Sequence, residues 1–247
     1  MDGSATMESP EVLRIHLGRG TNGELMSGAT VDACLAFLAG SDLTIVDLDG
    51  PPPELHPRFF DLVILVRALR RRLVHRCNLA VAAQPEYAHL PDFLAEHRVD
   101  VVAALPGRPA ATPGALDLLQ ALRRFNAAGY GQPGSGLILD LVVPSPVEGE
   151  SSIASSLEAH GVRWSGLHVV PRAPVLPDAG LVEELQRLCG SLHPARVLAV
   201  PCRWALSVDW DGSLSDGTTP LGRNIRELML PPAPRGAWSS EEAASPA

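Results

Sequence analysis

The sequence predicts an α/β fold built from about six strand–helix units. Short runs rich in β-branched residues alternate along the chain with longer segments whose apolar residues recur at helical spacing. Strands that alternate with helices of this length favour parallel pairing through right-handed crossover connections. The chain has 247 residues, of which 46% are hydrophobic, so it can form one large domain with a sizeable core.

Six segments are predicted as strands, each short and apolar. In chain order they are Val12–Leu17, Leu43–Leu48, Leu73–Cys77, Asp100–Leu105, Leu137–Val143 and Leu167–Val170. This count is lower than the eight strands of a closed (β/α)8 barrel. The count alone therefore leaves a smaller barrel and a doubly wound sheet as solutions.

Four segments are predicted as helices, at Val31–Leu38, Phe59–Arg72, Ala115–Ala128 and Leu181–Leu188. Thr30 is a suitable N-cap for the first helix, and Gly129 is a suitable C′ glycine for the third. Beyond them, Leu206–Leu214 alternates around Asp211-Gly212, which predicts an antiparallel hairpin.

Composition excludes several classes of function. The formal net charge is -8, which argues against nucleic acid or an anionic membrane as the main partner. All 20 basic residues are arginine, so a lysine Schiff base and a P-loop lysine are excluded. No targeting segment and no apolar run long enough to cross a bilayer is visible, so we expect a cytoplasmic protein. The cysteines occur singly at Cys34, Cys77, Cys189 and Cys202, which is typical of reduced thiols.

One glycine-rich motif follows the first predicted strand. Gly18-Arg19-Gly20-Thr21-Asn22-Gly23 fits the pattern G-x-G-x-x-G, but a single match of this kind is weak. A dinucleotide site also needs an acidic residue about twenty positions further on. Asp47 and Asp49 lie nearly thirty positions downstream, so we interpret the motif as a loop that tolerates glycine.

Several blocks of the sequence extend in order over roughly residues 12–215 and read LRIHLGR, TVDACLAFL, DLDGPPPELHPRFF, RCNLA, LPDFLAEHRVDVV, LRRFNAAGYGQPGSGLILDLVV and VPCRWALSVDWDG. Together these blocks resemble the arsenosugar-biosynthesis branch of the radical S-adenosylmethionine (SAM) enzymes. The resemblance implies a partial (β/α)6 TIM-type barrel with a C-terminal extension. We therefore expect a flexible N-terminus at 1–10, the barrel at 11–200, the remnant extension at 201–230 and a disordered tail at 231–247.

The chain departs from this family at the residues that would bind its cofactors. The family holds a [4Fe–4S] cluster with C-x-x-x-C-x-x-C in the first loop, where this chain has LGRGTNGELMS at 17–27. Thr21 corresponds to the first cysteine, and the nearest thiol is Cys34 in the following helix. The family's turn that contacts the SAM amino group carries two glycines, whereas here it reads Gly50 followed by three prolines. The cysteines that would bind the cluster are missing, and proline has no N–H with which to contact SAM. We therefore expect neither the cluster nor SAM as a cofactor.

Polar residues at the carboxyl ends of the predicted strands are the candidate ligand-binding residues, because barrel active sites are built there. They are Asp49, Glu54, His75, Cys77, Asn78, Asp140, His168, Cys202 and Arg203. Each also has a simpler interpretation: a hydrogen-bonded histidine at a strand end, a buried thiol, or a paired charge. His75, Cys77, Asp140 and His168 are suitable types for zinc or iron, or for a Cys–His nucleophilic pair. Their spacing matches no ligand signature, so no metal is predicted.

Three functions fit this sequence. The leading hypothesis is a cluster-free, radical-SAM-like protein that acts as a non-catalytic binding or partner subunit in a biosynthetic pathway. Its partner would be a pathway enzyme or a small molecule. The alternatives are an enzyme with non-radical chemistry in the barrel mouth and a still-active arsenosugar-type radical SAM enzyme.

Overall fold

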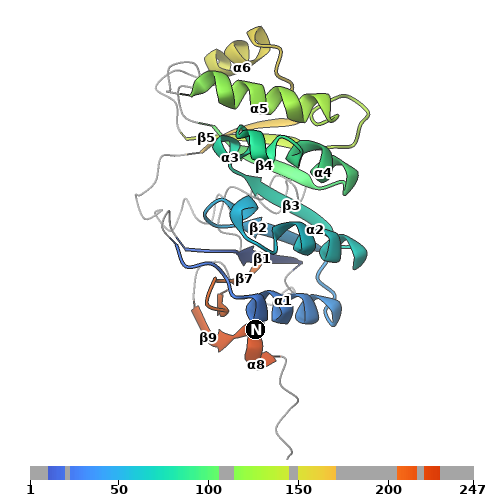
Figure 1. The fold of residues 1–247 in the computed structure, drawn as a ribbon, viewed down its shortest axis with the longest axis vertical. Coiled ribbons are helices and arrows are strands. Elements are labelled where there is room, and N and C mark those ends of the chain that lie inside the picture. The colour runs from blue at the N-terminus through green and yellow to red at the C-terminus, as the bar shows by residue number, and fades with distance from the viewer. Residues whose placement is uncertain are drawn as a thin grey trace, which may run out of the picture.

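A computed structural model describes residues 11–19, 23–105, 114–144, 150–170, 205–215 and 220–228. Within these residues, nine strands form one sheet with the order β6-β5-β4-β3-β2-β1-β7-β8-β9 (Figure 1). Strands β1 to β6 and β7 run parallel, and β8 and β9 are antiparallel. Because β6 and β9 are its two edges, the described sheet does not close on itself.

The first half of the chain supplies β1, β2 and β3 with their helices. The elements are β1 Val12–His16, α1 Gly28–Ala39, β2 Ile45–Asp49, the 3₁₀ helix η1 Pro53–Leu55, α2 Phe59–Ala68 and β3 Arg72–Cys77. The middle of the chain continues with α3 Leu79–Ala82, η2 Pro85–Tyr87, α4 Leu90–Glu96, β4 Asp100–Ala104, α5 Ala115–Ala127, β5 Leu139–Pro144, α6 Glu150–Ala159 and β6 Gly166–Val170. The last elements are β7 Ala205–Val208, β8 Ser213–Ser215, β9 Pro220–Asn224 and α8 Ile225–Leu228.

The α/β fold with six consecutive parallel strands agrees with the prediction, and the hairpin is present as β7 and β8. The pairing of β7 with β1 was not predicted. Because these two strands are parallel neighbours, the hairpin extends the barrel sheet. Strand β9 was not predicted. The predicted helix at Leu181–Leu188 and both chain ends lie outside the described residues.

Two predicted helix boundaries were wrong. The first helix begins at Gly28 with Ser27 as its N-cap, since the Ser27 hydroxyl accepts a hydrogen bond from the Thr30 amide. The second helix ends at Ala68 and not at Arg72, because the Arg72 amide donates to the Thr44 carbonyl and begins β3. The third helix ends where predicted, before Gly129, whose φ of 103° favours glycine.

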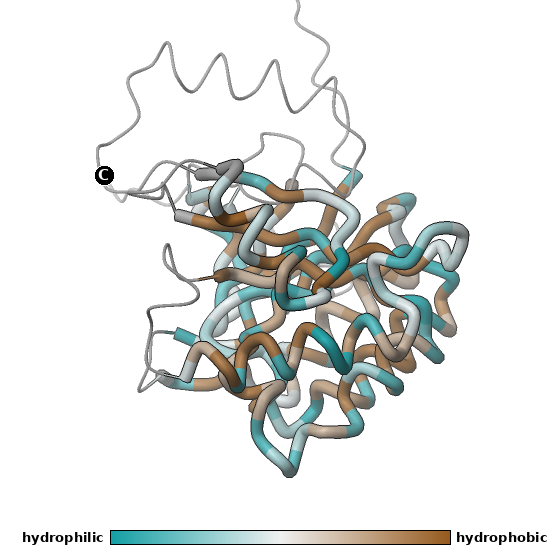
Figure 2. The backbone as a smooth tube through the Cα atoms, turned by 90° about the horizontal axis from the view of Figure 1, so that it is seen from above, coloured by the Kyte–Doolittle hydropathy of each residue, from teal (hydrophilic) through white to brown (hydrophobic). Residues whose placement is uncertain are grey.

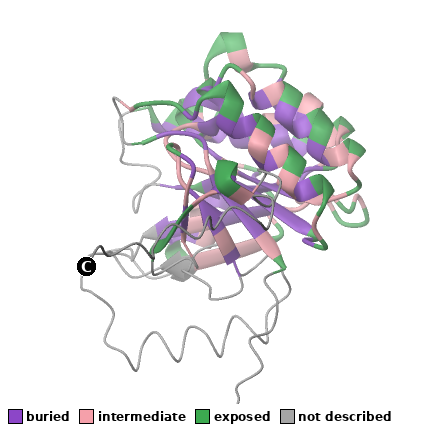
Figure 3. Cartoon of the chain, turned by 90° about the horizontal axis from the view of Figure 1, so that it is seen from below, coloured by how far each residue is buried: buried purple, intermediate pink, exposed green. Residues whose placement is uncertain are grey.

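The helices pack against one face of the sheet and form the main core. Apolar stretches recur along strands and helices alike (Figure 2), and the strands are mostly buried while the helices alternate between buried and exposed residues (Figure 3). Fully buried members of this core include Leu13, Phe59, Leu73, Phe125 and Leu139. A smaller apolar strip, Ile45, Val74 and Val102 with Val12 and Val142 beside them, lies on the opposite, inner face. Among the described residues, no helix is long and apolar enough to span a membrane.

Candidate functional site

Strand β3 separates two groups of polar side chains, because successive residues of a strand point to opposite faces. Leu73 and Cys77 belong to the helix-side core, and Val74 belongs to the inner strip. His75 therefore faces the helices, where its ring lies 4.9 Å from that of Phe59 in α2. Arg76 faces the inner side of the sheet.

The inner face carries a compact ion-pair network centred on Asp47. The Asp47 carboxylate is fully buried and accepts hydrogen bonds from Arg14 Nε at 2.8 Å and from Arg76 Nη2 at 3.1 Å. Arg76 Nε also lies 3.3 Å from the Asp49 carboxylate. Buried charges must be paired in this way to offset their lost hydration. Each charged group of the network has a partner of opposite charge among the described residues, so we interpret the network as structural.

The helix side of β3 carries a second cluster, the Glu54–His75–Cys77 triad. One potential ligand atom from each side chain lies within 4.8 Å of the other two, and all three residues are buried. His75 Nε2 lies 3.0 Å from Glu54 Oε1, which also accepts a hydrogen bond of 2.7 Å from the Asn78 amide. The β2–α2 turn supplies Glu54, while alternate positions of β3 supply His75 and Cys77.

Burial and charge act in opposite directions within this triad. Burial works to raise the pKa of Glu54, but the interaction with His75 outweighs it and the pKa lies below its ordinary value. The pKa of the Cys77 thiol is raised well above its usual value. Burial is the larger cause, and the negative charge of Glu54 is the next. Glu54 is therefore an anion at neutral pH, and Cys77 is an uncharged thiol in the absence of a cation.

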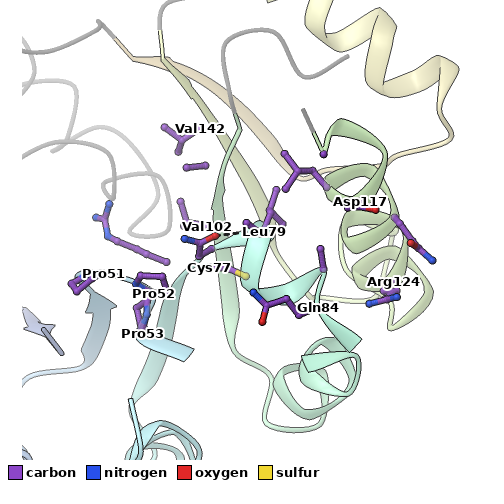
Figure 4. A pocket seen from close by; sticks show the side chains of 18 of the residues that line it. Pro51, Pro52, Pro53, Cys77, Leu79, Gln84, Val102, Asp117, Arg124 and Val142 are labelled. Carbon is purple, nitrogen blue, oxygen red and sulfur yellow. Dashed lines mark hydrogen bonds between the residues drawn. The ribbon is translucent and has the colours of Figure 1, made fainter. Parts of the chain in front are cut away.

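A cavity of about 1150 Å³ opens at the carboxyl ends of β2 to β5. Pro51 to Pro53 lie on one side of it, Asp117 and Arg124 of α5 lie on the other, and the Cys77 sulfur lies between them (Figure 4). Asn78, predicted as a site residue, also lines it and accepts a hydrogen bond from the Ala80 amide as the N-cap of α3. We call this region the open half of the mouth.

The α5 side of this cavity was not predicted from the sequence. Asp117, Gln120 and Arg124 all line it and lie at positions i, i+3 and i+7 of one helix. Arg124 Nη1 is buried without a hydrogen-bond partner among the described residues. The helical spacing of these three polar residues is the signal that could have identified the face.

The other part of the mouth, above β1, β2 and β7, is filled by contacts between loops. We call residues 17–19, 23–27 and 209–212, together with Gly50 and His56, the closed half; the prolines between Gly50 and Glu54 border the cavity of the open half. Gly18 forms an antiparallel bridge with Leu25, and the Arg19 amide donates to the Glu24 carbonyl at 3.0 Å. Trp210 Nε1 donates to the Glu24 carboxylate at 3.1 Å, and the Arg19 guanidinium lies 4.8 Å from the centre of the Trp210 ring.

The turn after β2 packs directly on this loop and offers few donors. Gly50 has a φ of 113°, and a Cβ atom there would lie 3.3 Å from the Gly18 backbone. The Gly50 amide already donates to Asp49 Oδ1 at 2.7 Å, and the three prolines that follow have no N–H. His56 Nε2 donates to the Met26 carbonyl at 2.8 Å and joins the two loops.

The closed half does not fit an iron–sulfur cluster. A [4Fe–4S] cluster of the radical SAM type requires thiolates from the first loop, and residues 17–27 contain no cysteine. Cys34 is the nearest thiol in sequence, but its side chain is buried in the core on α1. Burial raises the pKa of the Cys34 thiol to about 12, and among the described residues Cys34 belongs to no group of potential metal ligands.

The structure divides the predicted site residues among separate places. Asp49, Cys77 and Asn78 line the open half, whereas Glu54 and His75 are buried and are not among its lining residues. Asp140 and His168 form a separate pair on β5 and β6, with carboxylate and imidazole 3.5 Å apart. Neither His75 nor Asp140 is among the described residues that line the cavity. Cys202 and Arg203 lie outside the described residues.

Comparisons with known proteins place this arrangement in a known fold. No protein-family model and no curated protein sequence matches the chain. Among solved structures, SuiB of Streptococcus suis bound to S-adenosylmethionine matches 89% of this chain with a TM-score of 0.60 and 12% sequence identity. SuiB bound to the precursor peptide SuiA matches 89% of this chain with a TM-score of 0.60 and 11% identity.

This chain has the fold of the matched part of SuiB. At this level of identity the likeness establishes the fold, and the expected partial barrel of the radical SAM type is confirmed. The match covers 64% of the SAM-bound SuiB chain, so this chain spans less than two thirds of that protein.

Proposed function

We propose that this protein is a cluster-free member of the radical SAM fold, acting as a non-catalytic binding or partner subunit in a biosynthetic pathway. The carrying observation is the closed half of the mouth, where a cysteine-free loop is tied to the proline turn and the β7–β8 turn. We also propose that it derives from the arsenosugar branch, on the strength of its sequence blocks, and that it is cytoplasmic.

The open half supports a binding role. Its cavity of about 1150 Å³ is large enough for a small molecule or a peptide side chain, and its walls combine apolar and polar residues. Arg124 contributes a buried N–H without a partner among the described residues, which favours an anionic ligand. SuiB is bound to a small molecule in one structure and to a precursor peptide in another, so both kinds of partner are reasonable candidates.

SAM itself should bind weakly. The chain lacks cluster thiolates that would hold the methionine group, and Gly50 to Pro53 present no free amide donor. Each lost charge-assisted hydrogen bond costs about 1.5–3 kcal/mol, so two or three such losses weaken binding by about a hundredfold or more. Isothermal titration calorimetry should give a millimolar dissociation constant. Micromolar affinity without a cluster would contradict the proposal and favour a non-radical enzyme that uses SAM.

The cavity can be tested with a matched pair of arginines on α5. A thermal-shift screen of small carboxylates and phosphates would identify a ligand, and Arg124→Ala should weaken its binding by about 1.5–3 kcal/mol. Arg123, whose Nε donates to the His160 carbonyl, is exposed on the same helix, so Arg123→Ala should have no effect. Equal effects of the two variants would show that the ligand does not occupy the cavity.

A second candidate function is an enzyme with polar, non-radical chemistry. One observation favours it: the Glu54–His75–Cys77 triad lies at the border of the open half, with Cys77 lining the cavity. A carboxylate, an imidazole and a thiol in contact are the components of several kinds of acid–base and nucleophilic site. Turnover that disappears in Cys77→Ala but persists in Cys34→Ala would support this candidate.

A further inference from the structure

The Glu54–His75–Cys77 triad contains buried polar atoms that the protein does not satisfy. Glu54 Oε2 and His75 Nδ1 are both inaccessible to solvent and have no hydrogen bond of ordinary geometry to any described residue, although the Cys77 thiol interacts with the Glu54 carboxylate. Each of these side chains is almost completely buried, at 2% and 0% exposure. A buried donor or acceptor without a partner is destabilising and rare, and an unseen ion is one of its few explanations.

The three side chains also form a suitable donor set for a transition metal. Carboxylate oxygen, imidazole nitrogen and thiolate sulfur are the ligands that Zn²⁺ accepts, usually in tetrahedral geometry. Zinc bonds of about 2.0–2.3 Å require ligand atoms roughly 3.3–3.8 Å apart. The ligand atoms of the triad already lie within 4.8 Å of one another, so small side-chain movements would complete the site.

The positions of these residues favour a built site over a chance cluster. His75 and Cys77 are two residues apart on β3 and point to the same side. Glu54 is fixed by the Asn78 amide, which donates to Oε1 at 2.7 Å and leaves Oε2 without a hydrogen bond among the described residues. Such hydrogen bonds to ligating carboxylates are typical supports of metal sites.

Charge balance also favours a divalent cation bound by the triad. A divalent cation bound by one carboxylate, one thiolate and a neutral imidazole forms a cluster with no net charge. A neutral cluster is far less costly to bury than an isolated carboxylate. Asp47, a carboxylate on the inner face of the sheet, is already paired with Arg14 and Arg76, so it does not compete for the cation.

We propose that Glu54, His75 and Cys77 bind Zn²⁺ as a three-ligand site at the edge of the open half. Cys77 lines the cavity, so the fourth position of the metal would be available to water or to a ligand in the cavity. This site was not predicted from the sequence, because the spacing of the candidate residues matches no ligand signature and Glu54 was not grouped with His75 and Cys77. The zinc site does not rest on the proposed function, because it needs neither the absence of an iron–sulfur cluster nor a ligand in the cavity.

The test uses the full chain, reduced and stripped with a chelator, and then titrated with Zn²⁺ alone or with Co²⁺. The wild type should bind one equivalent of zinc, and Co²⁺ should give a thiolate-to-cobalt charge-transfer band in the near ultraviolet. X-ray absorption of the zinc form should detect a single sulfur ligand among nitrogen and oxygen ligands. A folded wild type that binds no zinc, or a first shell without sulfur, would overturn the proposal.

Matched variants locate the site. Cys77→Ser, His75→Gln and Glu54→Gln should each weaken zinc binding more than about 100-fold, because the loss of outer-shell partners alone costs roughly 10–100-fold. Cys34→Ser replaces another buried thiol and should bind zinc as the wild type does. The melting temperature of each variant is measured with and without zinc, so a less stable variant remains informative. Zinc that still stabilises Cys77→Ser as strongly as the wild type would contradict the proposal.

Discussion

The two halves of the mouth lie side by side on one sheet and differ in how far the chain satisfies its own polar groups. In the closed half, the Arg19 and Gly50 amides and the Glu24 carboxylate all have partners within the protein. In and below the open half, Arg124, His75 and Glu54 each keep a buried atom without a partner among the described residues. Polar groups without internal partners are the ones that can bind a ligand. This difference is the reason we propose a structural role for the closed half and a binding role for the open half.

Both halves rest on the Asp47 network, so its removal should have the largest effect. Asp47→Ala leaves Arg14 and Arg76 beside each other without the carboxylate between them. Removing one partner of a buried ion pair costs about 3–5 kcal/mol, and we expect the free energy of unfolding in urea to fall by that amount. Asp32→Ala, which breaks an exposed pair with Arg58, should cost less than about 1 kcal/mol. Similar costs for the two variants would mean that the network does not support the mouth.

The packing of the closed half depends on Gly50. Gly50→Ala introduces a strained φ and a Cβ only 3.3 Å from the Gly18 backbone, so we expect a loss of about 2–3 kcal/mol. Gly134 also has a positive φ, but a Cβ there would have no atom within 4 Å. Gly134→Ala should therefore cost only about 1 kcal/mol in the same unfolding experiment. If the two variants lost equal stability, the turn would not be packed against the loop.

Trp210 joins the hairpin turn to the first loop, and its loss should loosen the closed half alone. Trp210→Ala removes the hydrogen bond to Glu24 and the contact with Arg19, at a cost of about 1 kcal/mol. Hydrogen exchange at the Arg19 and Met26 amides should accelerate, whereas exchange at the Ala82 amide near the cavity should not change. Acceleration at all three amides would show that the two halves are coupled.

The smallest effect is expected at the tip of the hairpin. Hydrogen bonds from the Ser213 hydroxyl and amide lower the pKa of Asp211. A carboxyl with a lowered folded pKa contributes stability above its unfolded value near 3.8, and this contribution is lost as the pH falls through the folded pKa. The stability difference between the wild type and Asp211→Asn should therefore shrink on acidification. A difference that grows in acid would have the wrong sign.

The order of strands and helices could be predicted because each unit carries its own local signal. Strands such as Leu73–Cys77 are short apolar runs, and Gly129 marks the end of its helix. The parallel pairing of β7 with β1 could not be predicted, because it joins residues far apart in the chain without a local pattern. The end of α2 was missed because the Arg72 amide bonds to the carbonyl of Thr44, which directly precedes the neighbouring strand β2.

The candidate site was predicted residue by residue but not as an arrangement. Alternation shows that His75 and Cys77 share a face, but both faces of β3 carry apolar residues, so the sequence does not say which face they share. For the same reason, the contact between Glu54 and His75 could not be predicted, because it depends on how the proline turn folds over the end of β3. The α5 side of the cavity was not predicted, although the helical spacing of its polar residues could have identified it.

The central claim is that the closed half holds no iron–sulfur cluster, and anaerobic reconstitution tests it most directly. The purified protein would be treated with iron and sulfide, desalted, and incubated with dithionite and SAM. We predict a colourless protein without stoichiometric iron and no formation of 5′-deoxyadenosine. A brown protein with cluster iron that cleaves SAM to 5′-deoxyadenosine would contradict the account and identify a still-active radical SAM enzyme.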